Sequence, residues 1–246
     1  MTTTTRRPDA WSEPDGSASR PLGTVFITGG SSGLGAAVAA AVANGGGTPA
    51  VIDLVPPPAD VAHAVADLAD SAAAAGAVDD LVSRVGPPSA VVTAAGIDAC
   101  GPLDAVDVDA WERVVRVNLL GTAAVVRACL PHLVERRGTV VTVASTLGLK
   151  AVSDATAYCA SKFGIVGFTR ALATELAGRV GVTLLVPGGM RTAFFDGRAE
   201  QYRPGPDADL NDPRHVADVV VHALRQPVGC EVREIVVASS TEPSWP

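Results

Sequence analysis

Positive charge is scarce in this sequence. Among 246 residues, 26 acidic side chains outnumber 19 Lys and Arg, which gives a net charge of −7. Basic residues are adjacent only at Arg6–Arg7 and Arg136–Arg137. Because binding to a nucleic-acid backbone needs a clustered positive face, we expect no nucleic-acid partner.

Cysteine and histidine are also few, and their spacing is not that of a metal site or a disulfide framework. The four cysteines, Cys100, Cys129, Cys159 and Cys230, form no CxxC pair. They are expected to be small buried apolar side chains in a reducing compartment. The four histidines lack metal-ligand spacing, so we predict no metal.

Long apolar runs are missing as well. No stretch reaches the ~18 residues that span a membrane without interruption by polar or turn residues. Residues 1–20 carry an Arg pair with no apolar segment behind it, which argues against a signal peptide. Their Thr, Ser, Pro, Asp and Gly content predicts a disordered tail over residues 1–21. We therefore expect a cytoplasmic protein with no membrane partner.

The apolar residues that are present are mostly small. They make up 48% of the chain, while aromatics make up only 4%, a composition suited to helices packed closely on a buried sheet. From Gly23 onward, β-branched runs alternate with alanine-rich segments. Strands are expected at Thr24–Thr28, Ala50–Leu54, Ala90–Thr93, Thr139–Ala144, Val182–Val186 and Glu234–Ala238, with Val61–Ala66 ambiguous. Helices are expected at Ala36–Asn44, Asp79–Val85, Ala110–Arg136, Thr156–Ala177 and Pro213–Leu224.

This alternation predicts βαβ units, and hence a parallel sheet with helices on both faces. No linker divides the chain after residue 22. We therefore predict one α/β domain over residues 22–246, built on a doubly wound, Rossmann-type parallel sheet.

A glycine-rich segment joins the first strand to the first helix. Thr28–Gly35 has the spacing G-x-x-x-G-x-G, and a helix beginning there offers free N–H groups and a positive dipole end to a pyrophosphate. A structural turn would have the same composition. A P-loop is excluded, because Ala36 follows Gly35. The candidate phosphate-binding residues are Gly29, Ser31, Ser32, Gly33, Leu34 and Gly35.

An acidic residue closes the second strand. Asp53 lies 18 residues beyond Gly35, where a carboxylate can accept both hydroxyls of an adenosine ribose and repel a 2′-phosphate. Neither Leu54–Asp60 nor Gly30–Ser32 contains Lys or Arg, so we predict NAD as the cofactor. Asp53 could instead cap the next segment. Asp67 and Leu68 could bracket the adenine, or Asp67 could be a plain cap. Leu54 is a further candidate cofactor-binding residue.

A tyrosine and a lysine are placed one helical turn apart. Tyr158 and Lys162, at i and i+4, lie on one helical face. A phenol ordinarily titrates near ~10, and a cation one turn away is expected to lower that pKa toward neutrality. The pair also occurs by chance on helix surfaces, so its meaning depends on what surrounds it.

Six sequence motifs together resemble the short-chain dehydrogenase/reductase family, in family order and spacing from about residue 22 to 240. They are Thr28-Gly29-x-x-x-Gly33-x-Gly35, Ala95-Gly96, Asn118, Ser145, Tyr158-x-x-x-Lys162 and Pro187-Gly188-x-x-x-Thr192. The resemblance implies an NAD-dependent oxidoreductase that moves a hydride between nicotinamide and a secondary alcohol or ketone. It further places Ala94, Ala95, Gly96, Tyr158, Lys162, Pro187, Gly188, Met190 and Thr192 at the cofactor.

The resemblance also implies catalytic roles. Ser145 would hold the substrate oxygen against Tyr158, the acid/base. Lys162 would bind the nicotinamide ribose and lower the pKa of Tyr158. Asn118 would anchor a water that links Lys162 to solvent. Thr192 and the backbone near Met190 would hold the carboxamide.

The chain departs from the family pattern at two places. Thr93 and Ala94 stand where the family usually has two asparagines, which puts in doubt some hydrogen bonding under the cofactor. Pro56–Pro58 lie in a short segment between the second and third strands, where a helix seen in most relatives is expected to be reduced to a turn. In the family, the region corresponding to Ala193–Asn211 is a mobile lid over a small-molecule substrate. The segment could instead be an ordinary surface loop whose aromatic side chains fill the core.

Two other functions remain compatible with the motifs. An epimerase would return the hydride to the same molecule and retain its NAD. A sensor would bind NAD without chemistry, but would not need the Tyr–Lys pair. The resemblance also implies a homo-oligomer, a dimer or tetramer, formed through the helices at Ala110–Arg136 and Thr156–Ala177.

Overall fold

The computed structural model describes residues 19–245. Its strands are β1 (Thr24–Thr28), β2 (Thr48–Asp53), β3 (Ala62–Val65), β4 (Ala90–Thr93), β5 (Thr139–Val143), β6 (Gly181–Pro187) and β7 (Glu234–Val237). Its main helices are α1 (Gly33–Asn44), α2 (Ser71–Val85), α3 (Val108–Val115), α4 (Thr122–Arg136), α5 (Thr156–Glu175) and α6 (Pro213–Leu224).

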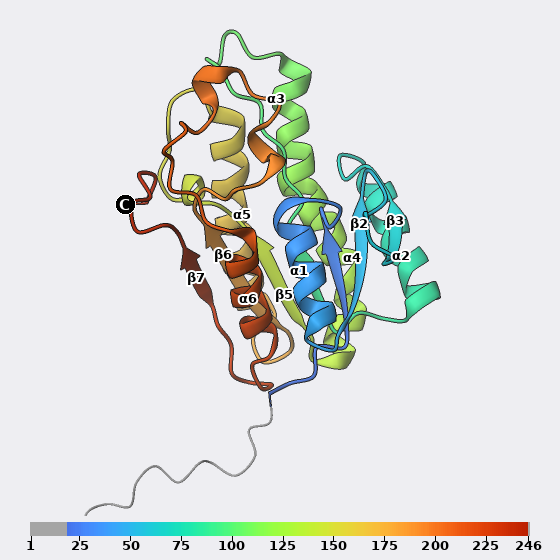
Figure 1. Cartoon of the computed structure of the whole chain (residues 1–246). Coiled ribbons are helices and arrows are strands. Elements are labelled where there is room, and N and C mark those ends of the chain that lie inside the picture. Colours follow the sequence, from blue (N-terminus) through green and yellow to red (C-terminus); the bar gives the residue numbers. More distant parts are fainter. Residues whose placement is uncertain (1–18, 246) are drawn as a thin grey trace, which may run out of the picture.

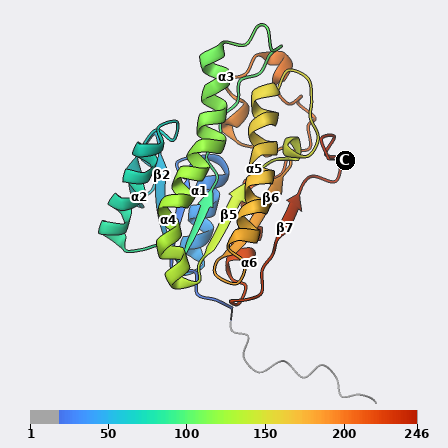
Figure 2. The same ribbon diagram turned by 180° about the vertical axis from the view of Figure 1, so that it is seen from behind.

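All seven strands form one parallel sheet in the order β3-β2-β1-β4-β5-β6-β7. The order reverses between β1 and β4, as in a doubly wound fold. Helices α1 and α6 cover one face (Figure 1), and α2, α4 and α5 cover the other (Figure 2). The predicted Rossmann-type fold is confirmed.

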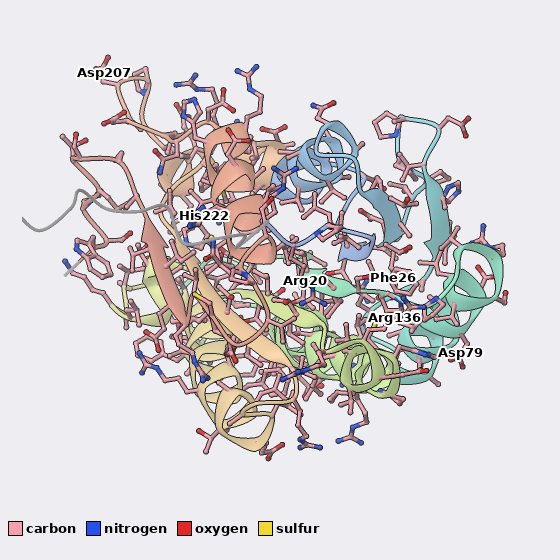
Figure 3. The ribbon with its side chains drawn as sticks, turned by 90° about the horizontal axis from the view of Figure 1, so that it is seen from below. Arg20, Phe26, Asp79, Arg136, Asp207 and His222 are labelled. Atoms are coloured by element: carbon pink, nitrogen blue, oxygen red, sulfur yellow. The ribbon has the colours of Figure 1, made fainter. Side chains whose placement is uncertain are left out.

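Strand alternation divides the core into two layers. Phe26, Ala50 and Ile52 face the side chains of α2 and α4, whereas Val25, Ile27 and Val51 face those of α1 and α6. Phe26, labelled in Figure 3, is fully buried in the first of these layers. Both faces of the central strands are therefore buried, which explains their uninterrupted apolar sequences.

The helices differ in detail from expectation. α2 begins at Ser71, eight residues before the expected start, because the Asp70 side chain accepts hydrogen bonds from the N–H groups of Ala72 and Ala73. The expected helix Ala110–Arg136 is a continuous helical run in which a π-helical turn, Arg116–Gly121, joins α3 to α4. No helix lies between β2 and β3, as predicted.

The described chain is attached to the domain from its first residues. The Arg20 amide donates to the carbonyl of Arg225. The Arg20 guanidinium donates to the carbonyl of Arg136, and these two residues are labelled in Figure 3. Residues 1–18, most of the predicted tail, lie outside the described residues.

The run Val108–Arg136 is long and apolar enough to cross a membrane by length and composition alone, since an 18-residue window within it has a mean hydropathy of 1.4. In this fold it packs against α2, α5 and the sheet, and 44% of that window is buried. A buried core helix meets the same two criteria.

Candidate active site

A cavity of about 930 Å³ opens at the carboxyl ends of the strands, where doubly wound folds bind ligands. Nearly all of the predicted site residues line it, although they come from distant parts of the sequence. Among the predicted cofactor and catalytic residues, two do not line it: Ser31 and Asn118.

The glycine-rich turn has the close packing that a phosphate cradle requires. Gly29 and Gly33 have positive φ angles of 71° and 53°. A Cβ at Gly35 would collide with the carbonyl oxygen of Gly29, and one at Gly33 would approach Thr192 to 3.5 Å. Ser32 begins α1 without using its side chain as a cap. The turn therefore brings backbone amides to the cavity and leaves room for a bound pyrophosphate.

Asp53 ends β2 beside this turn. One carboxylate oxygen accepts from the Ser31 amide at 2.9 Å and the other from the Leu54 amide at 2.7 Å. Ser31 is thus a support for Asp53, and its hydroxyl donates to the carbonyl of Val55. The carboxylate is held at the cavity wall, where a ribose would meet it.

Asp67 lines the same end of the cavity but is paired with a cation that sequence reasoning missed. Its carboxylate accepts from the Ala69 amide at 2.9 Å and pairs with Arg113 at 3.0 Å. These contacts, the Ala69 hydrogen bond first, lower the pKa of Asp67. Arg113 comes from α3, and nothing in its local sequence marks it as a cavity residue.

At the other end of the cavity, α5 brings Tyr158 and Lys162 together as predicted. The Lys162 ammonium lies 5.6 Å from the centre of the Tyr158 ring and donates to the carbonyl of Val143 at 2.9 Å. Ser145 follows β5 and faces the same cavity. Gly148 lets the loop after β5 pack closely against α5, because a Cβ at this position would lie 2.8 Å from the Lys162 carbonyl oxygen.

The expected lowering of the Tyr158 pKa is not found in this structure. Burial raises the pKa of the phenol above its ordinary value, and the hydrogen bond with Ser145 opposes this only in part. Burial also lowers the pKa of Lys162 to about 8, against the opposing charge of Asp98. Desolvation therefore outweighs the two influences that lower the pKa of the phenol, the Ser145 hydrogen bond and the charge of Arg198. Helix spacing alone does not reveal this balance.

Asn118 lies behind the cavity wall. Its side-chain oxygen accepts from the Ile97 amide at 2.9 Å, and its nitrogen donates to the Ile97 carbonyl and to Ser161. The side chain supports the loop after β4 and joins it to α5. Its predicted role in a proton relay through water remains a prediction.

The segment expected to be a lid borders the substrate end. The Phe194 ring lies 5.6 Å from the Tyr158 ring, and the Arg198 guanidinium stacks against both Phe194 and Phe195. Arg198 also pairs with Asp98 at 2.8 Å, and only 6% of the Asp98 side chain is exposed. Asp98 was not identified from the sequence, because an isolated acidic residue after a strand has no distinctive pattern.

Two further expectations can be compared with the structure. The Thr93 hydroxyl is buried without a hydrogen-bond partner, which agrees with the expected loss of hydrogen bonding at the departure from the family pattern. Cys129 and Cys159 are buried as expected, whereas Cys100 is only partly buried and Cys230 is exposed. Within residues 19–245, no cluster of His, Cys, Asp and Glu could hold a metal ion.

Comparison with known families identifies the chain. It matches the short chain dehydrogenase family over residues 23–203, which is more than half of its length. The protein therefore belongs to the short-chain dehydrogenase/reductase family, an oxidoreductase family that uses nicotinamide cofactors, as the motifs predicted.

Its relatives include several named dehydrogenases. It is 36% identical over 182 residues to a 2-dehydro-3-deoxy-L-rhamnonate dehydrogenase (NAD(+)) from a Sphingomonas species, covering 70% of this chain and 73% of the relative. It is 34% identical to 2-(S)-hydroxypropyl-CoM dehydrogenase 3 from Xanthobacter autotrophicus, covering 67% and 70%. A D-threitol dehydrogenase from Mycolicibacterium smegmatis is 32% identical, covering 63% and 64%.

Solved structures share the fold. A Thermoplasma acidophilum aldohexose dehydrogenase superposes with a TM-score of 0.79 at 22% identity, covering 87% of this chain and 92% of that one. An alcohol dehydrogenase from Thermococcus sibiricus, in complex with 5-hydroxy-NADP, gives 0.76 at 22% identity, covering 87% and 95%. At this identity the likeness extends to the fold alone.

Proposed function

We propose that this protein is an NAD(H)-dependent oxidoreductase that interconverts a secondary alcohol and a ketone, with Tyr158 as general acid/base. The observation that supports this best is the set of residues that line one cavity. The glycine turn and Asp53 line one end of the cavity, and Ser145, Tyr158 and Lys162 line the other end. Such a cavity can hold a dinucleotide and place a small substrate against the phenol.

The bound nicotinamide would supply the hydride chemistry and, when oxidised, a positive charge. The residues of this chain would position the substrate and move its proton. Ser145 would hold the substrate oxygen, and Tyr158 would give it a proton during reduction or remove one during oxidation. The raised pKa of Tyr158 keeps the phenol protonated at neutral pH, which suits the role of acid. Lys162 would hold the ribose hydroxyls and place positive charge near the phenol.

Asp53 supports NAD over NADP. Its carboxylate is held at the cavity wall by two amides, where a 2′-phosphate would meet negative charge. Arg113 also lines the cavity, but its charge is paired with that of Asp67. The relative named as NAD(+)-dependent is in keeping with this preference.

The substrate we propose is a small molecule with a hydroxyl-bearing carbon. The relatives named above act on hydroxylated compounds, one of them a sugar acid and another a polyol. We also propose a cytoplasmic location, no nucleic-acid or membrane partner, and assembly into a homo-oligomer.

A titration with NADH and NADPH, followed by cofactor fluorescence, tests this proposal. The wild type is expected to bind NADH at least about tenfold more tightly than NADPH. Asp53→Ala should weaken NADH binding roughly ten- to a hundredfold, because charged hydrogen bonds to the ribose are lost. Asp60→Ala is the matched control, since Asp60 is an exposed acidic residue in the loop that follows.

Tyr158→Phe separates binding from chemistry in the same experiment. The variant should bind NADH as the wild type does, while turnover of an alcohol falls by about 10²- to 10⁴-fold, the usual contribution of an acid/base group. Tighter binding of NADPH would reject the cofactor assignment. Near-normal turnover by the variant would reject the role of Tyr158.

A further inference from the structure

The chain after β7 returns to the active site. Thr241, Glu242, Pro243 and Ser244 all line the large cavity. The described chain continues past the carboxyl end of β7 (Figure 1), and this is the edge of the sheet at which the cavity opens. These residues lie beyond the part of the chain that matches the family, residues 23–203.

Glu242 makes the first contact of this segment with the site. Its Oε2 accepts from the Gly189 amide at 2.8 Å. The same oxygen fills the space that a Cβ at Gly188 would need. Gly188 and Gly189 follow β6, in the turn that we place beside the nicotinamide. The Glu242 carboxylate therefore packs against Gly188 and holds the turn through its hydrogen bond to Gly189.

The charge state of Glu242 suits this contact. Partial burial by itself would raise the pKa of Glu242. The hydrogen bonds from the Ser244 side chain and from the amides of Gly189 and Ser244 outweigh burial and lower that pKa. The carboxylate is therefore ionised at neutral pH, the form that accepts hydrogen bonds most strongly.

Ser244 makes the second contact. Its hydroxyl donates to Oε1 of Glu242. The hydroxyls of Ser244 and Thr146 also lie 2.7 Å apart. Since the single Ser244 proton is used on the carboxylate, Thr146 is the donor in that second hydrogen bond. Thr146 is buried and directly follows Ser145. Nearby, the Lys150 ammonium donates to the Pro243 carbonyl at 3.1 Å.

These contacts connect two loops at the carboxyl edge of the sheet. One loop follows β5 and includes Ser145, and the other follows β6 and includes Gly189. We propose that Glu242 and Ser244 are positioning residues that hold these two loops in register across the active site. The cofactor and substrate roles of the loops rest on the proposed function, whereas the contacts themselves do not.

The test compares Glu242→Ala, Glu242→Gln and Ser244→Ala with the wild type, each as the full chain. Glu135→Ala is the control, because Glu135 is exposed on α4 and its side chain makes no hydrogen bond within residues 19–245. The readouts are amide hydrogen exchange over residues 145–149 and 187–190 of the free protein, NADH affinity, and kcat and KM for an alcohol substrate.

Substitutions at Glu242 and at Ser244 should have different effects. Glu242→Ala should speed exchange of the Gly189 amide about tenfold and weaken NADH binding to a similar extent, as expected for one lost charged hydrogen bond. Glu242→Gln keeps an acceptor and should restore most of the Gly189 protection. Ser244→Ala should speed exchange near Thr146 and lower kcat, while the Gly189 amide and NADH affinity stay close to wild type.

Unchanged Gly189 exchange in a folded Glu242→Ala variant would overturn the proposal, as would identical behaviour of Ser244→Ala and Glu135→Ala. If Glu242→Ala does not fold, Glu242→Gln and Ser244→Ala decide the matter. Failure of the wild type to bind NADH or turn over an alcohol would instead reject the proposed function, and the exchange data would still test the contacts.

Discussion

At Lys162, burial and charge act in opposite directions. The side chain is only 4% exposed, and burial lowers its pKa from the ordinary 10.5 to about 8. The protein thus keeps an ammonium in a place where solvation is poor, next to Tyr158. Such a residue is expected to decrease stability while it serves function.

We expect Lys162→Met to stabilise the free protein at pH 7 by on the order of 3 kcal/mol at most, because burial lowers the pKa of Lys162 to about 8. Between pH 8 and 10.5 the unfolded chain binds more protons at Lys162 than the folded chain does, so wild-type stability rises with pH in that window. The advantage of the variant should therefore shrink across it.

Urea denaturation of both proteins at several pH values measures this difference. Each protein gives a curve of unfolding free energy against pH. Subtracting one curve from the other removes the contribution of Tyr158, which is present in both proteins. A stability difference that does not change with pH would contradict the assigned cause. The same variant should lose turnover, because methionine offers neither charge nor hydrogen bonds.

At the scale of elements, a buried ion pair joins the candidate lid to the loop after β4. Arg198 belongs to the segment after β6, whereas Asp98 belongs to the loop after β4. The two partners differ in what they can do when left alone. Arg198 can move into solvent with its loop, but Asp98 is almost fully buried and is also held by the Ala99 amide at 2.7 Å.

This asymmetry predicts different losses of stability. Arg198→Met leaves a buried carboxylate without its counter-charge and should cost about 3–5 kcal/mol of unfolding free energy. Asp98→Asn should cost clearly less and should mainly speed amide exchange over residues 193–203, because the lid opens. Denaturation and hydrogen exchange measure the two effects, and equal global losses would show that the lid is not free to move.

At the scale of the whole molecule, an apolar strip remains on the outer face of α5. Phe163 is 45% exposed, and Gly167, one turn later, has open space around it. Leu120, in the adjoining π-helical turn, is 50% exposed. This strip lies on the helices that the family resemblance assigns to the subunit interface.

We expect Gly167→Gln to shift the protein toward monomers, because a long side chain would separate two closely packed helices. Gly76→Gln is the matched control, since Gly76 is also an exposed helical glycine with open space, but on α2. Light scattering after gel filtration measures the mass of each. A monomeric wild type, or an unchanged mass for Gly167→Gln, would count against an interface at this strip.

The sequence by itself determined the fold and most of the cavity lining. Apolar strands bounded by glycine and helix signals set the order of elements, because each unit is stabilised by local patterns. The glycine turn, Asp53 and the Tyr158–Lys162 pair were predictable for the same reason: their spacing along the chain encodes their spacing in the fold.

Only the tertiary structure decided which other groups share the cavity and how they are charged. Arg113, Asp98 and Glu242 reach the site from segments without a motif. Parallel strands bring such segments together at one edge of the sheet, which sequence separation does not reveal. The pKa of Tyr158 depended likewise on burial, a property of the packed molecule, and not on the lysine one turn away.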